Sequence, residues 1–122
     1  MIVVDTSIWI DFFRRVDPIL EEKLIEYLEH RQIYGVSVVF GELLQGVRDE
    51  QEEKLILEYW KNLPKANEDS LFIDAGRLSF KHKLYSKGVG LIDCFIIAAA
   101  KSSQSEIWTH DKKLLQAYQL VR

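Results

Sequence analysis

The chain has 122 residues, 48% of them hydrophobic and 29% charged, and these proportions predict one globular domain with a buried core. The formal net charge of −3 argues against a basic protein that coats nucleic acid, although local contacts with nucleic acid stay open. No apolar run approaches the roughly 18 residues of a membrane span, and Asp5 interrupts the apolar start too early for a secretory signal. The single cysteine, Cys94, cannot form an intramolecular disulfide, which favours a cytoplasmic protein.

The first part of the chain predicts two short strands, each followed by helical sequence. The apolar run that ends at Asp5 predicts a short buried strand over residues 2–5. Asp17 before Pro18 is typical of an N-cap and a first helical position, and this pair predicts a helix near 18–30. The segment QIYGVS predicts a second strand that ends at Ser37, which can cap the next helix. The apolar stripe of that helix comprises Val39, Phe40, Leu43, Leu44 and Val47.

The middle of the chain predicts two further helices. Asp49 with Glu52 three residues later resembles a capping box and predicts a helix that ends at Pro64. The segment SLFID predicts either a short strand or an extended entry to the next helix. Asp74 at the end of this segment predicts the N-cap of a helix over 75–87.

The last part of the chain predicts a helix, a strand and a final helix. Gly88 terminates the preceding helix, and the apolar run CFIIAAA predicts a buried helix over 91–102. The segment EIWT predicts a strand, and KKLLQAYQL predicts a short helix. Strands that alternate with helices imply a parallel sheet covered on both faces, so the predicted fold class is α/β.

Four acidic residues stand apart from most of the others, which sit at helix caps or on solvated helix faces. Asp5 and Asp111 follow the predicted strands IVV and EIWT, whose carboxyl ends share the edge where α/β sheets bind ligands. Glu42 and Asp93 are single acids on the apolar segments VVFGELLQG and GLIDCFIIAAA, helices that begin at the same edge. Each acid has an ordinary alternative role as a turn cap, a helix cap, a first-turn acid or a solvated side chain. Their convergence on one edge favours a shared site.

Four neighbouring carboxylates would repel one another and raise their own pKa values. A divalent cation would relieve this repulsion, and ligation by oxygen alone suits Mg²⁺ or Mn²⁺ rather than zinc. The histidines His30, His82 and His110 are dispersed along the chain and show no zinc-type spacing. The acids therefore predict a magnesium or manganese site.

The segments that carry these acids form an ordered set that resembles the PIN-domain ribonucleases, most closely the VapC-type toxins of toxin–antitoxin pairs. The four segments are VDTSIWIDFF, SVVFGELLQGV, KGVGLIDCFIIAAA and WTHDKKL. The resemblance covers essentially residues 1–122, and it implies a single PIN-like nuclease domain with a three-layer α/β/α fold around a short parallel sheet. Two features depart from the family. Lys112, Lys113 and Gln116 stand where some members have a further acid, and the terminal QLVR leaves a final strand short or missing.

The resemblance also implies roles for individual residues. The catalytic acids it implies are Asp5, Glu42, Asp93 and Asp111, with Asp5 and Asp93 as direct metal ligands. The neighbouring hydroxyls would hold these carboxylates by hydrogen bonds, and they belong to Thr6, Ser7 and Thr109. The implied protein is a cytoplasmic, Mg²⁺- or Mn²⁺-dependent endoribonuclease that acts as a toxin, forms a homodimer and is bound by a small antitoxin protein.

Other classes of function stay open. A catalytically silent PIN-like module could act through protein or RNA binding, and it need not be stabilised by a metal. A receiver-type phosphoacceptor domain would need paired acids at the first strand end, where VVDTS has one. DNA in place of RNA is an alternative within the nuclease class. Basic residues at the rim of the site could bind phosphates of either nucleic acid, and the candidates are Arg14, Arg15, Arg48, Lys112 and Lys113.

Overall fold

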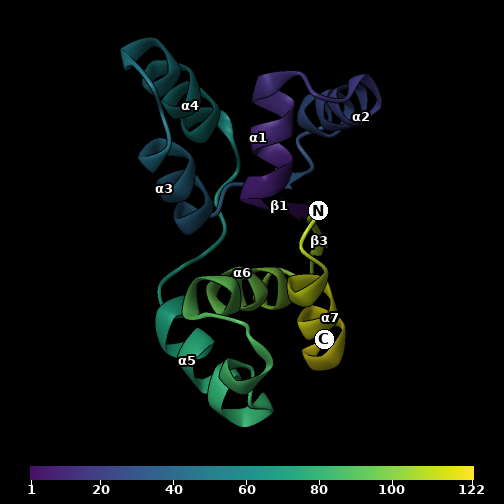
Figure 1. Cartoon of the computed structure of the whole chain (residues 1–122), viewed down its shortest axis with the longest axis vertical. Coiled ribbons are helices and arrows are strands. Elements are labelled where there is room, and N and C mark those ends of the chain that lie inside the picture. The colour runs from purple at the N-terminus through teal and green to yellow at the C-terminus, as the bar shows by residue number, and fades with distance from the viewer.

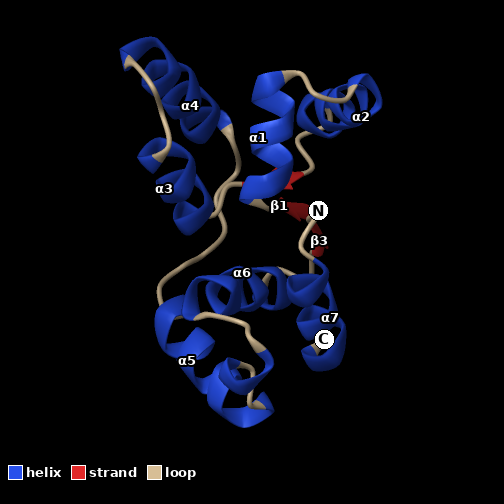
Figure 2. Cartoon of the chain, viewed as in Figure 1, coloured by secondary structure: helices blue, strands red, loops and turns tan.

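A short parallel sheet lies between two groups of helices in the computed structural model, which describes residues 1–122 (Figure 1). The sheet has the order β2-β1-β3 and consists of β1 (Ile2–Val4), β2 (Ile33–Tyr34) and β3 (Glu106–Trp108). Both neighbours pair with β1 in parallel, so all three strands end at one edge. Figure 2 shows how small this sheet is beside the helices. The predicted α/β class with three layers and a short parallel sheet is therefore confirmed.

Helices α1 to α4 lie on one side of the sheet and α5 to α7 on the other (Figure 1). The first group comprises α1 (Thr6–Arg14), α2 (Pro18–Glu29), α3 (Ser37–Gln45) and α4 (Glu50–Asn62). The second group comprises α5 (Leu71–His82), the 3₁₀ turn η1 (Tyr85–Lys87), α6 (Leu91–Ser102) and α7 (Lys112–Val121). None of these helices combines the length and hydropathy that crossing a bilayer requires.

Helix α6 is the central helix of the second group, and it packs against α5, α7 and the sheet. Every side chain from Cys94 to Ala100 is buried, as the sequence predicts for this apolar run. A helix that is apolar on all faces is stable only when protein surrounds it, and α6 is surrounded in this way. Its first turn carries Asp93, so the packing of α6 fixes where that carboxylate lies.

An aromatic cluster joins α1 to α3 and α4. The ring of Trp9, which is fully buried, lies 5.5 Å from that of Phe40 and 5.7 Å from that of Tyr59. Edge-to-face pairs of this kind add to the free energy gained by burial. The cluster fixes α1, which begins directly after Asp5, against α3, which carries Glu42.

Several predicted helix starts are confirmed. The Asp17 side chain accepts hydrogen bonds from the backbone N–H groups of Ile19 and Leu20, as an N-cap does. The Asp49 side chain accepts from the N–H of Glu52, at 2.8 Å. The predicted helices over 18–30 and 91–102, the strands over 2–5 and EIWT, and the final helix agree with the structure to within about two residues.

Residues 6–14 form a helix, α1, that the sequence analysis did not assign. Its buried face holds Ile8, Trp9 and Phe12, a spacing that fits a helical stripe. Most of its stability comes from tertiary packing, because a helix of nine residues is marginal on its own.

The prediction for SLFID was wrong, because these residues belong to the start of α5 rather than to a strand or an extended entry. Asp74 lies in the first turn of α5 and accepts a hydrogen bond from Ser70 Oγ, so it is not the N-cap. The predicted helix over 75–87 is also interrupted. It ends at Lys83, which has a left-handed backbone, and Gly88, with φ of +80°, closes the η1 turn that follows.

Ser37 is not the cap of its helix. It is the first residue of α3, and Val36 occupies the N-cap position without a side-chain hydrogen bond. The backbone N–H and the hydroxyl of Ser37 both donate to the carboxylate of Glu68, from the segment that links α4 to α5. The free N–H groups at the start of α3 are therefore partly satisfied by a residue distant in sequence.

Candidate active site

Asp5 directly follows β1 and therefore lies at the carboxyl edge of the sheet, where it is 8% exposed. Its backbone N–H bonds the carbonyl of Trp108 on β3, at 2.9 Å. Its carboxylate Oδ2 accepts from the hydroxyls of Thr109, at 2.7 Å, and Ser7, at 3.2 Å. Asp5 occupies the N-cap position of α1, yet its side chain makes no capping bond. The carboxylate is therefore held by side-chain hydroxyls rather than by the backbone N–H groups of the helix start.

Asp111 lies at the same edge, after β3, and caps α7. Its Oδ1 accepts from the backbone N–H groups of Lys113, at 2.9 Å, and Leu114, at 3.2 Å. Its own N–H donates to Thr109 Oγ1 at 2.9 Å, so one threonine hydroxyl connects Asp111 to Asp5. The alternative role as a helix cap is thus correct for one oxygen of Asp111, and its second oxygen makes no hydrogen bond within the chain.

Glu42 projects from α3 and is exposed to solvent. Its Oε1 accepts from the Thr6 hydroxyl at 2.7 Å, across 36 residues of sequence. Because Thr6 directly follows Asp5, this bond places Glu42 beside the end of β1. The structure thus shows hydroxyl contacts to the acids from all three predicted residues, namely Thr6, Ser7 and Thr109.

Asp93 lies in the first turn of α6 and is half-buried, and its carboxylate makes no hydrogen bond within the chain. Burial, and to a lesser extent the charges of Asp111, Asp5 and Glu42, raise its pKa from 3.8 to about 6. The structure therefore brings the four predicted acids within electrostatic reach of one another. We refer to these four residues as the acidic cluster.

The acidic cluster is open in its present side-chain conformations. No three Asp, Glu, His or Cys side chains are grouped closely enough to enclose an ion. Its donors are carboxylate oxygens alone, which is the chemistry that Mg²⁺ and Mn²⁺ favour. The half-buried, unpartnered carboxylate of Asp93 and its raised pKa also fit a cation, because a positive charge would remove the repulsion among the acids.

A second contact anchors α1 to the turn between β3 and α7. His110 Nε2 lies 2.8 Å from Asp11 Oδ2, and the His110 N–H donates to Ser7 Oγ at 3.1 Å. His110 therefore faces Asp11 and not the acidic cluster. The role of Asp11 was missed, although it is a single acid in the apolar segment WIDFF, the same signal that identified Glu42 and Asp93.

The largest cleft, of about 750 Å³, lies between α5 and the last turn of α6, which is the end of that helix opposite Asp93. None of the four acids of the acidic cluster lines this cleft. Glu42 instead borders a smaller groove of about 270 Å³ between α1, α3 and α4. Arg14 and Arg48, two of the five predicted rim residues, line this groove over a largely apolar floor.

Comparisons with known proteins agree with this geometry. The family model for the PIN domain matches residues 2–120. Ribonuclease VapC32 of Mycobacterium tuberculosis, in strains CDC 1551 / Oshkosh and ATCC 25618 / H37Rv, is 29% identical over 121 residues. That alignment covers 96% of this chain and 90% of the relative. The crystal structure of FitAcB from Neisseria gonorrhoeae has the same fold, with a TM-score of 0.64 at 16% identity, covering 98% of this chain and 94% of the other.

Proposed function

This chain belongs to the PIN domain family, and from that premise we propose that it is a metal-dependent endoribonuclease that hydrolyses phosphodiester bonds in RNA. The observation that carries the proposal is the convergence of the acidic cluster from four separate elements onto one sheet edge. The similarity to a protein named Ribonuclease VapC32 supports RNA as the substrate and a toxin of a toxin–antitoxin pair as the biological role.

Two residues are best suited to hold the ion directly, as the family resemblance implies. Asp5 uses one oxygen for hydroxyl contacts, which leaves Oδ1 available as a ligand. Asp93 has both oxygens available and gains most from a neighbouring positive charge. A divalent cation, when bound, would polarise a phosphate oxygen and lower the pKa of water.

The other two acids are suited to handle water and protons. Glu42 Oε2 and Asp111 Oδ2 make no hydrogen bonds within the chain, so each can accept a proton or orient a water molecule. The hydroxyl of Thr109 restricts Asp5 and the loop before Asp111 at once, which keeps these two carboxylates in a fixed relation.

The toxin role adds partners and a compartment to the proposal. We expect a small antitoxin protein that inserts a peptide at the acidic cluster, a homodimeric toxin and a cytoplasmic location, with residues 1–122 acting as one nuclease domain. The lone cysteine, which is buried, is compatible with a reducing compartment.

The experiment that tests the function incubates the purified chain with a pool of tRNA, rRNA and mRNA in Mn²⁺ and maps the new RNA ends. We expect discrete ends in Mn²⁺, none in excess EDTA and none with Asp93→Asn. Asp74→Asn is the matched control, because Asp74 is also a half-buried acid in the first turn of a helix but lies on α5. Cleavage that persists in EDTA, or in the Asp93 variant at the wild-type rate, would contradict the proposal. A chain that binds RNA without cutting it would instead be a silent binding module.

A further inference from the structure

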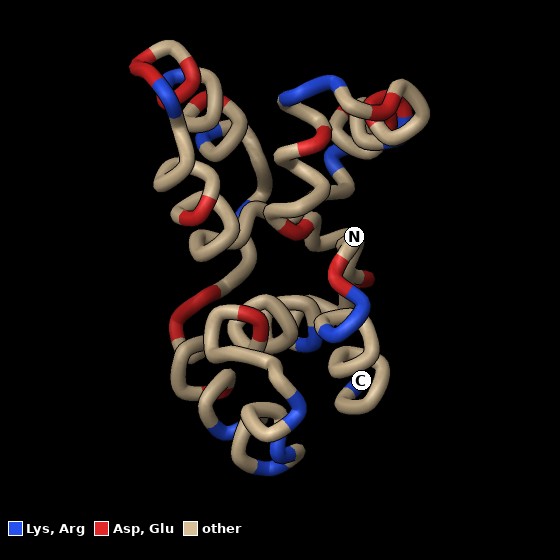
Figure 3. Tube along the Cα trace, viewed as in Figure 1, with Lys and Arg blue, Asp and Glu red and all other residues tan.

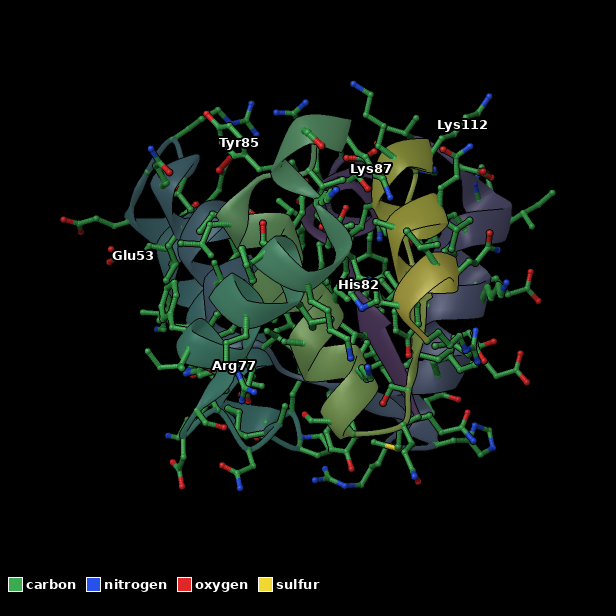
Figure 4. The ribbon with its side chains drawn as sticks, turned by 90° about the horizontal axis from the view of Figure 1, so that it is seen from below. Glu53, Arg77, His82, Tyr85, Lys87 and Lys112 are labelled. Carbon is green, nitrogen blue, oxygen red and sulfur yellow. The ribbon has the colours of Figure 1, made fainter.

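A cationic cleft of about 230 Å³ lies between α7 and the segment that leads into α6. Two of the lining residues are charged, and both are lysines. We refer to it as the lysine cleft, and its lining residues are Lys87, Val89, Lys113, Gln116, Ala117 and Leu120. Figure 4 shows Lys87 and the neighbouring Lys112 at one end of the molecule, where η1 approaches the start of α7. The cleft therefore offers two ammonium groups and an amide, with no carboxylate to neutralise them.

A glycine gives Lys113 its position in this cleft. The Cβ of any other residue at position 88 would lie 3.2 Å from Lys113 Nζ and 3.8 Å from its Cδ. Gly88 also has φ of +80°, a conformation that other residues rarely adopt. Lys113 thus extends across Gly88 toward the side of the cleft formed by Lys87. The four ion pairs of the chain involve other residues, so neither lysine is neutralised by a carboxylate.

Each wall of the lysine cleft belongs to a segment that also carries an acid of the acidic cluster. Lys113 lies two residues after Asp111, and its backbone N–H donates to that carboxylate. On the other wall, the chain runs from Lys87 through Gly88 to Gly90, the N-cap position of α6, whose first turn carries Asp93. Figure 3 shows these basic positions on η1 and at the start of α7, on the α5–α7 side of the sheet.

An acidic cluster of four carboxylates repels a polyanion, so RNA needs cations beside it. On the basis of the proposed ribonuclease function, we propose that the lysine cleft is a subsite for a backbone phosphate of the RNA, next to the bond that is cut. Lys87 and Lys113 donate to the phosphate oxygens, and the strand continues from there across the acidic cluster. RNA fits better than an acidic peptide because a single strand presents phosphates both to the cleft and to the neighbouring cluster.

The test measures RNA binding separately from cleavage. All proteins carry Asp93→Asn so that no cleavage interferes, and a labelled single-stranded RNA is titrated by fluorescence anisotropy in Mn²⁺ at several salt concentrations. We expect Lys87→Ala with Lys113→Ala to raise Kd about 10-fold. The slope of log K against log salt should fall by about 0.7 for one lost phosphate contact. Lys87→Arg with Lys113→Arg should retain the parent Kd and slope.

Lys101→Ala is the matched control, because Lys101 is an exposed lysine on the last turn of α6, at the opposite end from Asp93. An equal loss in this control would assign the effect to overall charge and overturn the subsite. An unchanged Kd in the double alanine variant would do the same. If the lysines control binding while the wild-type chain cuts no RNA, the ribonuclease function fails and the subsite stands.

The position of the phosphate is tested from the RNA side. Methylphosphonate linkages, which carry no charge, replace the phosphates one at a time. We expect one linkage at which the replacement weakens binding to the parent protein but not to the double alanine variant. Equal penalties in both proteins at every linkage would overturn the assignment of the lysine cleft to one phosphate.

Discussion

The two sides of the acidic cluster hold their carboxylates in different ways. On the α1–α3 side, Asp5 and Glu42 accept hydrogen bonds from side-chain hydroxyls. On the α6–α7 side, the Asp111 carboxylate accepts hydrogen bonds from backbone N–H groups, whereas the Asp93 carboxylate accepts none and its pKa rises to about 6. Hydrogen-bond donors favour the charged form of a carboxylate, and burial disfavours it. The comparison indicates that the α1–α3 side is fixed before any ligand arrives, whereas on the other side Asp111 is held by backbone donors and only Asp93 depends on a cation.

The strongest test of this difference is to neutralise the unpartnered acid. Asp93→Asn should lower RNA cleavage by more than about 100-fold. Loss of a residue that only hydrogen-bonds to a metal ligand costs up to about 100-fold, and loss of a direct ligand should cost more. Without metal, the Asp93→Asn variant should be at least as stable as wild type. Burial and repulsion disfavour the charged form of Asp93, as its raised pKa indicates, and the variant removes that charge. Cleavage assays and thermal melts in EDTA provide the two measurements. Asp93→Asn that is active but destabilised would identify Asp93 as an ordinary first-turn helix acid.

The second test is the response of stability to metal. Mn²⁺ at a hundredfold excess over its dissociation constant should stabilise the wild-type chain by about 2.7 kcal/mol. The gain should largely vanish in Asp93→Asn and should be retained in Asp74→Asn, which leaves the acidic cluster intact. Thermal melts of the three proteins with and without Mn²⁺ measure this stabilisation. An equal gain in all three proteins would show that the ion binds elsewhere.

The sequence predicted the convergence of the acids better than the helices that hold them. Parallel strands end at one edge, so the placement of Asp5 and Asp111 follows from topology alone. Helix α1 was missed because its stability depends on contacts of Trp9 with rings on α3 and α4, which are distant in sequence. The resemblance implied hydroxyl contacts from Thr6, Ser7 and Thr109, but which acid each hydroxyl contacts depends on the fold, since Thr109 bonds Asp5 across 104 residues of sequence.

The segment SLFID shows a different limit of sequence analysis. The segment was predicted to be a short strand or an extended entry to the next helix, yet its apolar residues Phe72 and Ile73 lie on α5 and are 56% and 70% exposed. Hydrophobic periodicity indicates an element only when the apolar residues are buried. The Phe72 ring does contact Phe95 on α6, with ring centroids 4.7 Å apart, so it contributes to packing from an exposed position.

The third test removes a hydroxyl from the fixed side. Thr109→Val deletes the donor to Asp5 and the acceptor for the N–H of Asp111. We expect a loss of about 1 kcal/mol in the free energy of unfolding and about 10- to 100-fold weaker Mn²⁺ binding. Thr6→Val is the control, because its partner Glu42 is exposed and water can replace the lost bond. Chemical denaturation and Mn²⁺ titration give both values, and equal effects of the two variants would remove the special role of Thr109.

The last prediction concerns the pH dependence of metal-free stability. The pKa of Asp93 is about 6 in the folded chain against an ordinary value of 3.8, so the folded state binds more protons than the unfolded state between these values. Stability must therefore fall as pH rises through this range, and the full penalty is present above about pH 6. This is the opposite of the behaviour of a carboxylate stabilised by donors, which loses stability as pH falls.

The difference between wild type and Asp93→Asn isolates this contribution, because other groups titrate alike in both proteins. Urea melts in EDTA at pH 4, 5, 6 and 7 should show the advantage of the variant growing with pH and levelling off above about pH 6. Mn²⁺ should abolish or reverse the advantage, since a cation favours the charged form of Asp93 and binds wild type more tightly. A difference that is constant with pH, or that grows as pH falls, would show that Asp93 is stabilised as an anion without any metal. Asp93 would then belong with the fixed side of the cluster.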